Sequence, residues 1–278
     1  MDDSYPYFPN SSIEIINPAF GRGQIRYALF DFDGTLSLIR EGWQAIMIPM
    51  MVDLLLQTPR HEAPAQVETV VKEFVTRLTG KQTIYQMIQL CEEIRGRGGQ
   101  PREALFYKSL YNECLNQHIA DRIQGLKSGQ ISPAVLSVPG ASAWLEVLKR
   151  RGIVCYLASG TDEAFVIEEA ALLGLTPYFS GIYGAQEPYQ NFSKKMVIDR
   201  IIQTHQLHGP EFAAFGDGYV EIEDAKSVNG VAVGLATDEK NRAGVDTWKR
   251  SRLIAAGANL IIPDFQQADR LEAFLFQN

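Results

Sequence analysis

The stretch IRYALFDFDGTL, residues 25–36, constrains the fold most, because an apolar run ends abruptly in two aspartates. If this stretch is a buried strand that runs into a loop, Asp31 and Asp33 lie on one face of the pleat and Phe32 on the other. Two carboxylates at the end of a buried strand repel each other and lose hydration, so they need a cation, a shared proton or a chemical role. The alternative is a plain strand followed by an Asp-Gly turn.

The size and composition of the chain are typical of a globular protein with an acidic balance. Its 278 residues are 46% hydrophobic and 21% charged, which is enough for one large domain or two ordinary ones. The formal net charge of −7 disfavours nucleic acid and anionic membranes as partners and leaves an anionic small substrate open. The three cysteines lack metal-ligand spacing, and the sequence shows no secretory pattern and no apolar run of about 18 residues. We therefore expect a cytoplasmic protein.

Hydrophobic periodicity divides the chain into an alternating α/β part and a helical insert. Strand and helix patterns alternate with short loops from about residue 136 onward, and residues 37–135 show helical periodicity without a convincing strand. We predict an α/β fold with a doubly wound parallel-sheet (Rossmann-like) core, formed by residues 1–36 and 136–278, and an all-helical cap domain inserted over residues 37–135.

The predicted elements follow from these patterns. In the insert, helices are expected over residues 41–57, 65–78, 83–95 and 101–124. In the core, strands are expected over residues 153–158, 179–184, 212–215, 231–235 and 260–263, with a strand-like piece at 13–16. Core helices are expected over residues 141–150, 163–173, 193–205 and 221–228, with one more at the C-terminus.

Polar residues follow three separate strands of this predicted core. The carboxyl ends of parallel strands in a doubly wound sheet line one edge, where ligands bind. We therefore expect these side chains to converge in one crevice. They are Asp31 and Asp33 after the first strand, Ser159, Gly160 and Thr161 after residues 153–158, and Asp217 after residues 212–215.

The residue types at the first two strand ends fit phosphoryl transfer. A carboxylate at Asp31 can attack a phosphoryl group and form an aspartyl-phosphate, which splits hydrolysis into two displacements. Asp33 is placed to protonate the leaving oxygen and later to deprotonate water. The Ser159 hydroxyl and the backbone around Gly160, at the start of a helix, predict an anion cradle. A helix N-cap after a glycine turn is the alternative.

Two further features predict charged contacts. Lys194 and Lys195 lie in the first turn of a predicted helix, where cations oppose the helix dipole. We expect one of them to neutralise a phosphate or the nucleophile, and solvated surface lysines are the alternative. Asp217 and Glu221, four residues apart across a turn, suit Mg²⁺, which binds through one or two carboxylates and a substrate phosphate. Glu221 can also serve only to stabilise a helix N-terminus.

The order DFDGT, then SGT, then a lysine at a helix start, then GDG-x-x-E resembles the four motifs of the haloacid dehalogenase superfamily of phosphohydrolases. The resemblance covers the whole core. The insert lies between the first and second motifs, as in the subgroup with a helical cap. The order of the motifs therefore implies a Mg²⁺-dependent enzyme with the fold predicted above.

The resemblance also implies a role for each matching residue. Asp31 is expected to be the nucleophile and a metal ligand, and Asp33 the general acid/base whose backbone carbonyl also binds the metal. Ser159 and Gly160 are expected to bind phosphate, and Asp217 to bind Mg²⁺. For the lysine that stabilises the anion we choose Lys194 over Lys195. Val197 and Ile198 follow Lys194 at the spacing at which hydrophobic residues follow the lysine of the family.

Two positions qualify these implications. Glutamate stands at Glu221, where the family usually has aspartate, so its longer side chain reaches the metal directly, through water, or not at all; Asp224 is a further candidate. Asp33 separates activities within the family, because the dehalogenases that attack carbon lack this second aspartate. Phosphatases and phosphomutases keep it.

We therefore predict a Mg²⁺-dependent phosphohydrolase acting on a small phosphorylated metabolite, such as a sugar phosphate. A phosphomutase or phosphotransferase on the same scaffold, and a non-catalytic phosphate-sensing protein, are the alternatives. An insert of this length is typical of a lid, so we expect the cap to close over the crevice and select the leaving group. Arg40 and Trp43, just after the first motif, are the nearest cap-side candidates for contact with the substrate, and the polar residues 81–83 are the next.

Overall fold

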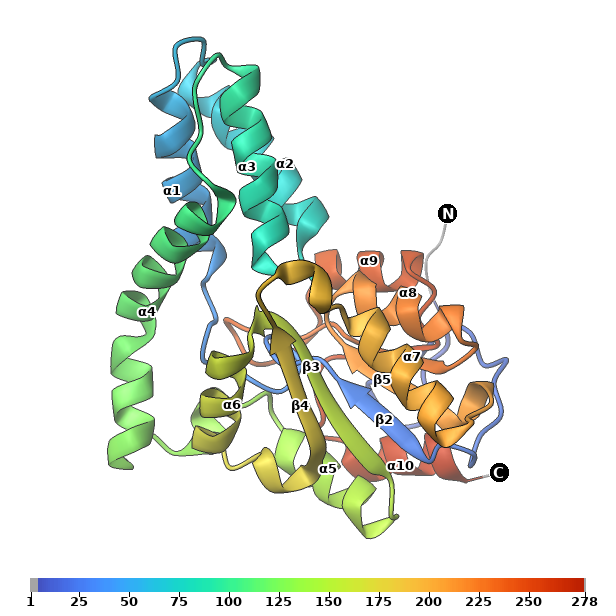
Figure 1. The fold of residues 1–278 in the computed structure, drawn as a ribbon. Helices are drawn as coiled ribbons and strands as arrows, with labels where there is room; N and C mark the ends of the chain where they lie inside the picture. The colour runs from blue at the N-terminus through green and yellow to red at the C-terminus, as the bar shows by residue number, and fades with distance from the viewer. Residues whose placement is uncertain (1–4, 278) are drawn as a thin grey trace. The chain divides into compact units, whose positions relative to one another are not determined.

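The structure, a computed structural model, describes residues 5–277 and divides into two compact units (Figure 1). Met1–Glu41 and Gly125–Asn278 form the first unit, and Gly42–Gln124 form the second. The second unit is narrower at both ends than the predicted insert, residues 37–135. Residues 37–41 and 125–135 therefore belong to the unit that contains the sheet.

The first unit is built on a sheet that has seven strands within residues 5–277, in the order β1-β7-β6-β5-β2-β3-β4. All neighbouring strands are parallel except β1, which pairs antiparallel with β7 at the edge. The chain order reverses between β2 and β5, because β3 lies beyond β2 on one side and β6 beyond β5 on the other. This arrangement confirms the doubly wound α/β fold. The strands are β1 (Glu14–Ile15), β2 (Tyr27–Phe30), β3 (Val154–Asp162), β4 (Phe179–Ala185), β5 (Phe212–Gly216), β6 (Val231–Leu235) and β7 (Leu260–Ile262).

The central strand β2 directs alternate side chains to the two faces of the sheet and leads into the first motif. Leu29 packs into an apolar cluster with residues of the helices α7 (Lys194–His205), α8 (Tyr219–Ser227) and α9 (Thr247–Ala255). The Phe30 ring stacks on that of Phe215 at 4.6 Å, near Trp144 of α5 (Ala141–Arg150). Phe30 is aligned with Phe215, and the Asp31 N–H donates to the carbonyl of Phe215 at 2.9 Å. Asp31 therefore leaves the sheet at the switch point, where ligands bind in folds of this type.

Helices and short 3₁₀ turns connect the strands of this unit. The helix α8 contacts both α7 and α9, and α5 contacts α10. The helices are α5 (Ala141–Arg150), α6 (Glu163–Leu172), α7 (Lys194–His205), α8 (Tyr219–Ser227), α9 (Thr247–Ala255) and α10 (Ala268–Phe276). The 3₁₀ turns are η1 (Pro133–Leu136), η2 (Thr176–Tyr178), η3 (Tyr189–Asn191) and η4 (Gly209–Glu211).

The second unit, all of whose residues are described, consists of helices joined by turns and loops and has no strand. It contains α1 (Gln44–Leu56), α2 (Pro64–Leu78), α3 (Thr83–Gly96) and most of α4 (Ala104–Ser128). The first three helices contact one another and bury side chains such as Met51, Phe74 and Met87. The sequence predicts that the fourth helix begins at Pro101, but it begins at Ala104. The N–H of Arg102 donates instead to the hydroxyl of Tyr107 at 3.1 Å.

Two elements differ more clearly from the sequence prediction. The sequence predicts a loop after residue 158. This prediction is wrong, because β3 continues to Asp162 and pairs there with Ala185 of β4. The helix α9 was not expected. It is capped by Asp246, whose side chain accepts hydrogen bonds of 2.9 Å from the N–H groups of Trp248 and Lys249. Both differences fall in segments that carry polar side chains of the site described below.

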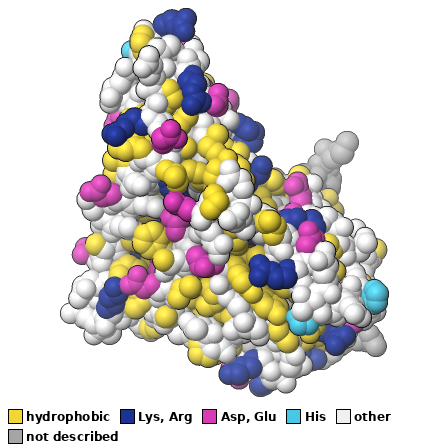
Figure 2. Space-filling model, in the orientation of Figure 1, with side chains coloured by type: hydrophobic (Ala, Val, Ile, Leu, Met, Phe, Trp, Pro, Cys, Tyr) yellow, Lys and Arg dark blue, Asp and Glu magenta, His cyan; other side chains and the backbone are white. Residues whose placement is uncertain are grey.

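On the face of the molecule shown in Figure 2, basic and acidic side chains are interspersed with apolar ones. The cysteines Cys91, Cys114 and Cys155 are all free thiols. Within the described part of the chain, no helix combines the length and the apolar composition that crossing a membrane requires.

Candidate active site

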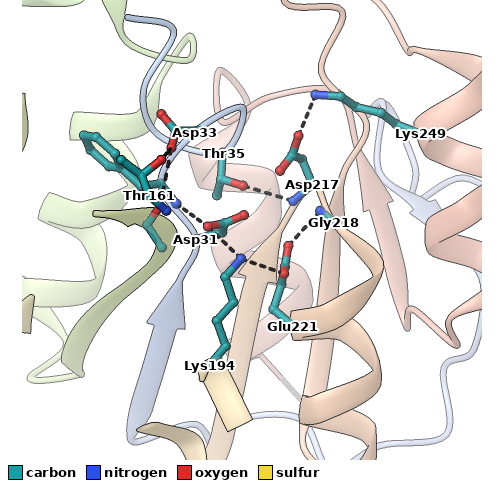
Figure 3. Close-up of polar contacts among 11 residues, drawn as sticks. Asp31, Asp33, Thr35, Thr161, Lys194, Asp217, Gly218, Glu221 and Lys249 are labelled. Carbon is teal, nitrogen blue, oxygen red and sulfur yellow. Dashed lines mark hydrogen bonds and ion pairs between the residues drawn. The ribbon is translucent and has the colours of Figure 1, made fainter. Parts of the chain in front are cut away.

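Asp31 lies in a buried group of charges at the carboxyl end of β2 (Figure 3). The ammonium of Lys194, the first residue of α7, is 2.8 Å from Asp31 Oδ1 and 2.9 Å from Glu221 Oε2. Asp31 Oδ1 also accepts a hydrogen bond of 2.8 Å from the N–H of Phe32. The side chain of Lys194 is only 3% exposed and that of Glu221 is fully buried. Lys194 thus bridges two carboxylates in a largely buried position.

Glu221 has a structural role and a site contact at the same time. Its Oε1 accepts a hydrogen bond of 2.7 Å from the N–H of Gly218, so it caps the helix α8 in which it lies. Its Oε2 contacts Lys194. A Cβ at Gly216 would lie 2.1 Å from Glu221 Oε1, so the first glycine of the GDG motif is required by this close approach.

The two lysines at the start of α7 have different surroundings. Lys194 points into the carboxylate group, whereas Lys195 has a side chain that is 39% exposed and pairs with Asp199 one helical turn later. The Ser193 hydroxyl caps the helix by accepting from the N–H of Met196 at 3.1 Å, as the sequence predicts. Burial alone would lower the pKa of Lys194, but Asp31 and Glu221 raise it above the ordinary lysine value. The two carboxylates therefore favour the charged form of Lys194 beside Asp31.

Asp33 belongs to a second polar group, formed with β3. Its Oδ2 accepts hydrogen bonds from the hydroxyls of Thr161, at 2.8 Å, and Ser159, at 3.4 Å. Gly160 lies between these residues in the strand. Asp33 Oδ1 is buried and has no hydrogen-bond partner in the part of the chain that is described. Burial raises the pKa of Asp33, against the lowering effect of the Arg40 guanidinium. A carboxyl group that holds its proton at higher pH suits a general acid.

Arg40, expected on the cap side, lies in the first unit. Its guanidinium donates to the carboxylate of Glu169 in α6 through Nε, at 3.0 and 3.1 Å, and through Nη2, at 2.6 Å. Both side chains are buried, at 6% and 3% exposure. Burial raises the pKa of Glu169 to about 7 even though Arg40 lowers it. Arg40 is therefore held inside the sheet-containing unit by a carboxylate that the sequence did not identify.

Asp217 has partners that sequence reasoning missed. Its N–H donates to the Thr35 hydroxyl at 3.0 Å, and its Oδ2 accepts a hydrogen bond of 2.7 Å from Lys249. The same ammonium donates to Glu239 Oε1 at 2.5 Å. Burial alone would lower the pKa of Lys249, but Asp217 and Glu239 raise it above the ordinary lysine value. The one sequence signal for this contact is Asp246, a helix N-cap residue that marks the start of α9.

The carboxylates fit a hard divalent cation such as Mg²⁺. Among the described residues, Asp31, Asp217 and Glu221 each offer a carboxylate oxygen, and these oxygens lie within 4.8 Å of one another. Burial raises the pKa of Asp31, while Lys194 lowers it. A bound cation would offset the repulsion among the three carboxylates and favour their ionised forms. The Asp33 side chain and Asp224 lie outside this group, and a contribution from the Asp33 backbone carbonyl stays a prediction.

The fold and this charged centre define an α/β enzyme whose site lies at the switch point of a doubly wound sheet. The chain belongs to the haloacid dehalogenase-like hydrolase family, since the family model of that description matches residues 25–229. This membership confirms the family resemblance that the motifs indicate. A comparison with curated protein sequences found no match.

Solved structures of similar fold cover nearly the whole chain. A predicted phosphoglycolate phosphatase from Haemophilus somnus 129PT is 15% identical, with a TM-score of 0.59 over 90% of this chain and 99% of that one. A predicted phosphatase from Clostridium acetobutylicum is 17% identical, with a TM-score of 0.58 over 89% and 98% of the two chains. A β-phosphoglucomutase from Clostridium difficile is 17% identical, with a TM-score of 0.57 over 87% and 92%. At these identities the comparison establishes the shared fold.

Proposed function

We propose that the protein is a Mg²⁺-dependent phosphatase that hydrolyses a small phosphorylated metabolite through an aspartyl-phosphate on Asp31. The observation that best supports this function is that the two aspartates of the first motif have different partners. Asp31 is paired with a buried cation, Lys194, whereas Asp33 is bound by hydroxyls of β3 and keeps one buried oxygen without a partner among the described residues. One carboxylate is thereby suited to attack and the other to proton transfer.

The contacts support an order of steps. Asp31 Oδ1 is engaged by Lys194 and by the N–H of Phe32, which supports Oδ2 as the oxygen that attacks phosphorus. Lys194 neutralises charge that the phosphoryl group brings to Asp31. Asp33 gives its proton to the leaving oxygen, then takes a proton from the water that cleaves the aspartyl-phosphate. Free phosphate and restored Asp31 complete the cycle.

The remaining site residues hold the phosphoryl group and the cation. Asp31, Asp217 and Glu221, together with the backbone carbonyl of Asp33, would hold Mg²⁺, which when bound supplies positive charge to the phosphoryl oxygens. Ser159 and Gly160 of β3 would contact the phosphate. Of the two lysines at the start of α7, the burial of Lys194 favours it as the residue that stabilises the anion.

The second unit is proposed as the cap that selects the leaving group. Solved structures similar to this chain carry the names phosphoglycolate phosphatase and β-phosphoglucomutase, and both names refer to small phosphorylated metabolites. We take the same class of substrate for this protein. Because Glu169 engages the guanidinium of Arg40, we assign Arg40 a supporting role beside Asp33. The three free thiols support a cytoplasmic location.

Phosphomutase or phosphotransferase activity is the second candidate, and the likeness to a β-phosphoglucomutase favours it. Such an enzyme would use the same residues and pass the phosphoryl group to a hydroxyl of a sugar. A non-catalytic phosphate sensor is disfavoured, because Asp31, Asp33 and Lys194 are all present and in contact with suitable partners.

A screen of phosphorylated metabolites in the presence of Mg²⁺ tests the proposal, with Asp31→Asn as the blank. We expect release of inorganic phosphate from at least one metabolite, and loss of that release in Asp31→Asn and after chelation of Mg²⁺. Equal release by Asp31→Asn would contradict the assignment. Conversion of a sugar phosphate to its isomer without free phosphate would favour the mutase.

A further inference from the structure

We propose that Lys249, together with Glu239, positions Asp217 for the divalent cation. Asp217 follows β5, Glu239 lies in the segment between β6 and α9, and Lys249 lies in the first turn of α9. Lys249 Nζ contacts Asp217 Oδ2 at 2.7 Å and Glu239 Oε1 at 2.5 Å. Three separate segments thus meet at one carboxylate of the cation group. The inference rests on the proposed function, because it assumes that Asp217 binds the cation.

The two carboxylate oxygens of Asp217 have different surroundings. Oδ2 is bound to Lys249, and the other oxygen points away from Lys249, toward the side where Asp31 and Glu221 lie (Figure 3). Thr35 fixes the backbone of the same residue by accepting its N–H at 3.0 Å. A hydrogen bond to the second oxygen of a carboxylate ligand holds the first oxygen in a defined direction, and such outer contacts strengthen metal binding.

The turn of the first motif leaves room for the contact between Asp217 and Lys249. A Cβ at Gly34 would lie 2.3 Å from Asp217 Oδ2 and 3.1 Å from Glu239 Oε1. The absence of a side chain at Gly34 therefore provides the space in which the Asp217 and Glu239 carboxylates reach the ammonium of Lys249. The side chain of Lys249 is only 10% exposed, so water competes little for these contacts.

Glu239 explains how a lysine can lie beside a cation site. An ammonium next to Asp217 would repel a divalent cation, but the Glu239 carboxylate is equally close to that ammonium and cancels most of its charge. Lys249 also lies at a helix N-terminus, where a positive charge is unfavourable, and the two carboxylates offset this cost. The pair can therefore orient Asp217 with little change in the electrostatic potential at the cation.

A purely structural tie between α9 and the segment after β6 would produce the same contacts, so the test must measure cation binding. The variant Lys249→Met/Glu239→Gln removes the pair without changing the net charge. Glu223→Gln/Lys240→Met makes the same changes of residue type at two exposed positions and is the matched control. Mn²⁺ binding is followed by electron paramagnetic resonance, with Mg²⁺ as competitor and without substrate.

We expect the pair variant to bind Mn²⁺ about 10- to 100-fold more weakly than wild type, as for other outer-contact changes. The matched control and Lys249→Arg should stay within about threefold of wild type, since arginine keeps a donor to Asp217. Phosphate release by the pair variant should be restored by raising Mg²⁺. Wild-type-like Mn²⁺ affinity in the pair variant would overturn the inference and leave the proposed function standing.

Two further outcomes keep the test decisive. If the pair variant does not fold, Glu239→Gln alone should weaken Mn²⁺ binding at least tenfold, because it leaves the Lys249 charge uncompensated; unchanged affinity there overturns the inference. If wild type binds no Mn²⁺ or Mg²⁺, the cation of the proposed function is wrong, and the role of Lys249 is overturned with it.

Discussion

Thr161 donates a hydrogen bond of 2.8 Å from its hydroxyl to Oδ2 of Asp33. Thr161 lies in β3, two residues beyond Ser159, whose Oγ accepts from the Thr161 N–H at 3.1 Å. The second motif therefore contacts the proposed general acid directly, in addition to any contact with phosphate. The direction of Asp33 Oδ1, which has no hydrogen-bond partner among residues 5–277, depends on this contact, because a carboxyl group held at one oxygen cannot rotate freely.

We predict that Thr161→Val lowers kcat by about tenfold and leaves KM nearly unchanged, because it releases Asp33 without removing a charge from the site. Steady-state kinetics on the substrate found by the metabolite screen measures both constants. Thr161→Ser is the control, since serine keeps the hydroxyl and should stay near wild type. A Thr161→Val enzyme with unchanged kcat would show that Asp33 needs no support from β3.

The two neighbouring lysines of α7 provide a matched pair of variants. Lys194→Met removes the buried cation between Asp31 and Glu221, and should lower kcat by about 100-fold or more. Lys195→Met removes a half-exposed cation that pairs with Asp199, and should leave kcat within about twofold. Phosphate release is the measurement. Equal losses in the two variants would contradict the assignment of the anion-stabilising lysine.

Alanine variants of Gly34 and Gly129 distinguish the stability cost of backbone strain from that of overpacking. Both glycines have φ of +74°, but a Cβ at Gly34 meets Asp217 Oδ2 at 2.3 Å, whereas a Cβ at Gly129 meets nothing within 4 Å. Each alanine variant should lose about 1 kcal/mol from backbone strain. Gly34→Ala should lose a further 1–3 kcal/mol or so from overpacking and also weaken cation binding. Chemical denaturation of both variants measures the difference, and equal losses would show that Asp217 moves aside without cost.

Stability should depend on pH through Glu169. Its pKa in the folded state, about 7, lies above the ordinary value of 4.5, so the folded state binds the proton more tightly than the unfolded chain. The resulting stabilisation is fully present below about pH 4.5 and is lost as pH rises through about 7, a change of roughly 3 kcal/mol. The free energy of unfolding should therefore fall less steeply over this range in Glu169→Gln than in wild type.

Glu68→Gln is the control for this pH dependence. Glu68 is half exposed and pairs with Lys72 on the surface, so its variant should keep the wild-type slope. Identical slopes for Glu169→Gln and wild type would mean that Arg40 keeps Glu169 ionised across the whole range.

The sequence predicted the parts of the fold and site that local patterns encode. The apolar run before Asp31 predicts a buried strand, and the alternation of strands and helices predicts a doubly wound sheet; the structure has both. The strand ends that the motifs mark are adjacent at the switch point, so Asp31 and Asp217 meet as expected. The family resemblance favoured Lys194 over Lys195, because hydrophobic residues follow it at the spacing of the family, and Lys194 is buried in the structure.

The rest depends on contacts between distant segments. Lys249 pairs with Asp217, which lies 32 residues away in the sequence, and α9 is a short helix of mostly polar sequence. The pairing of β3 with β4 extends the strand through Ser159 and Thr161, where local propensity predicts a loop. Arg40 follows the first motif, yet its partner Glu169 lies 129 residues further on. No local pattern contains such pairs.

The most direct test of the central claim is chemical trapping of the aspartyl-phosphate. Borohydride reduces an acyl phosphate of aspartate to homoserine, which peptide mass spectrometry detects at a defined residue. With substrate and Mg²⁺ present, the proposed function predicts homoserine at position 31 and unmodified aspartate at position 33. Homoserine at another residue, or none during active turnover, would contradict Asp31 as the nucleophile.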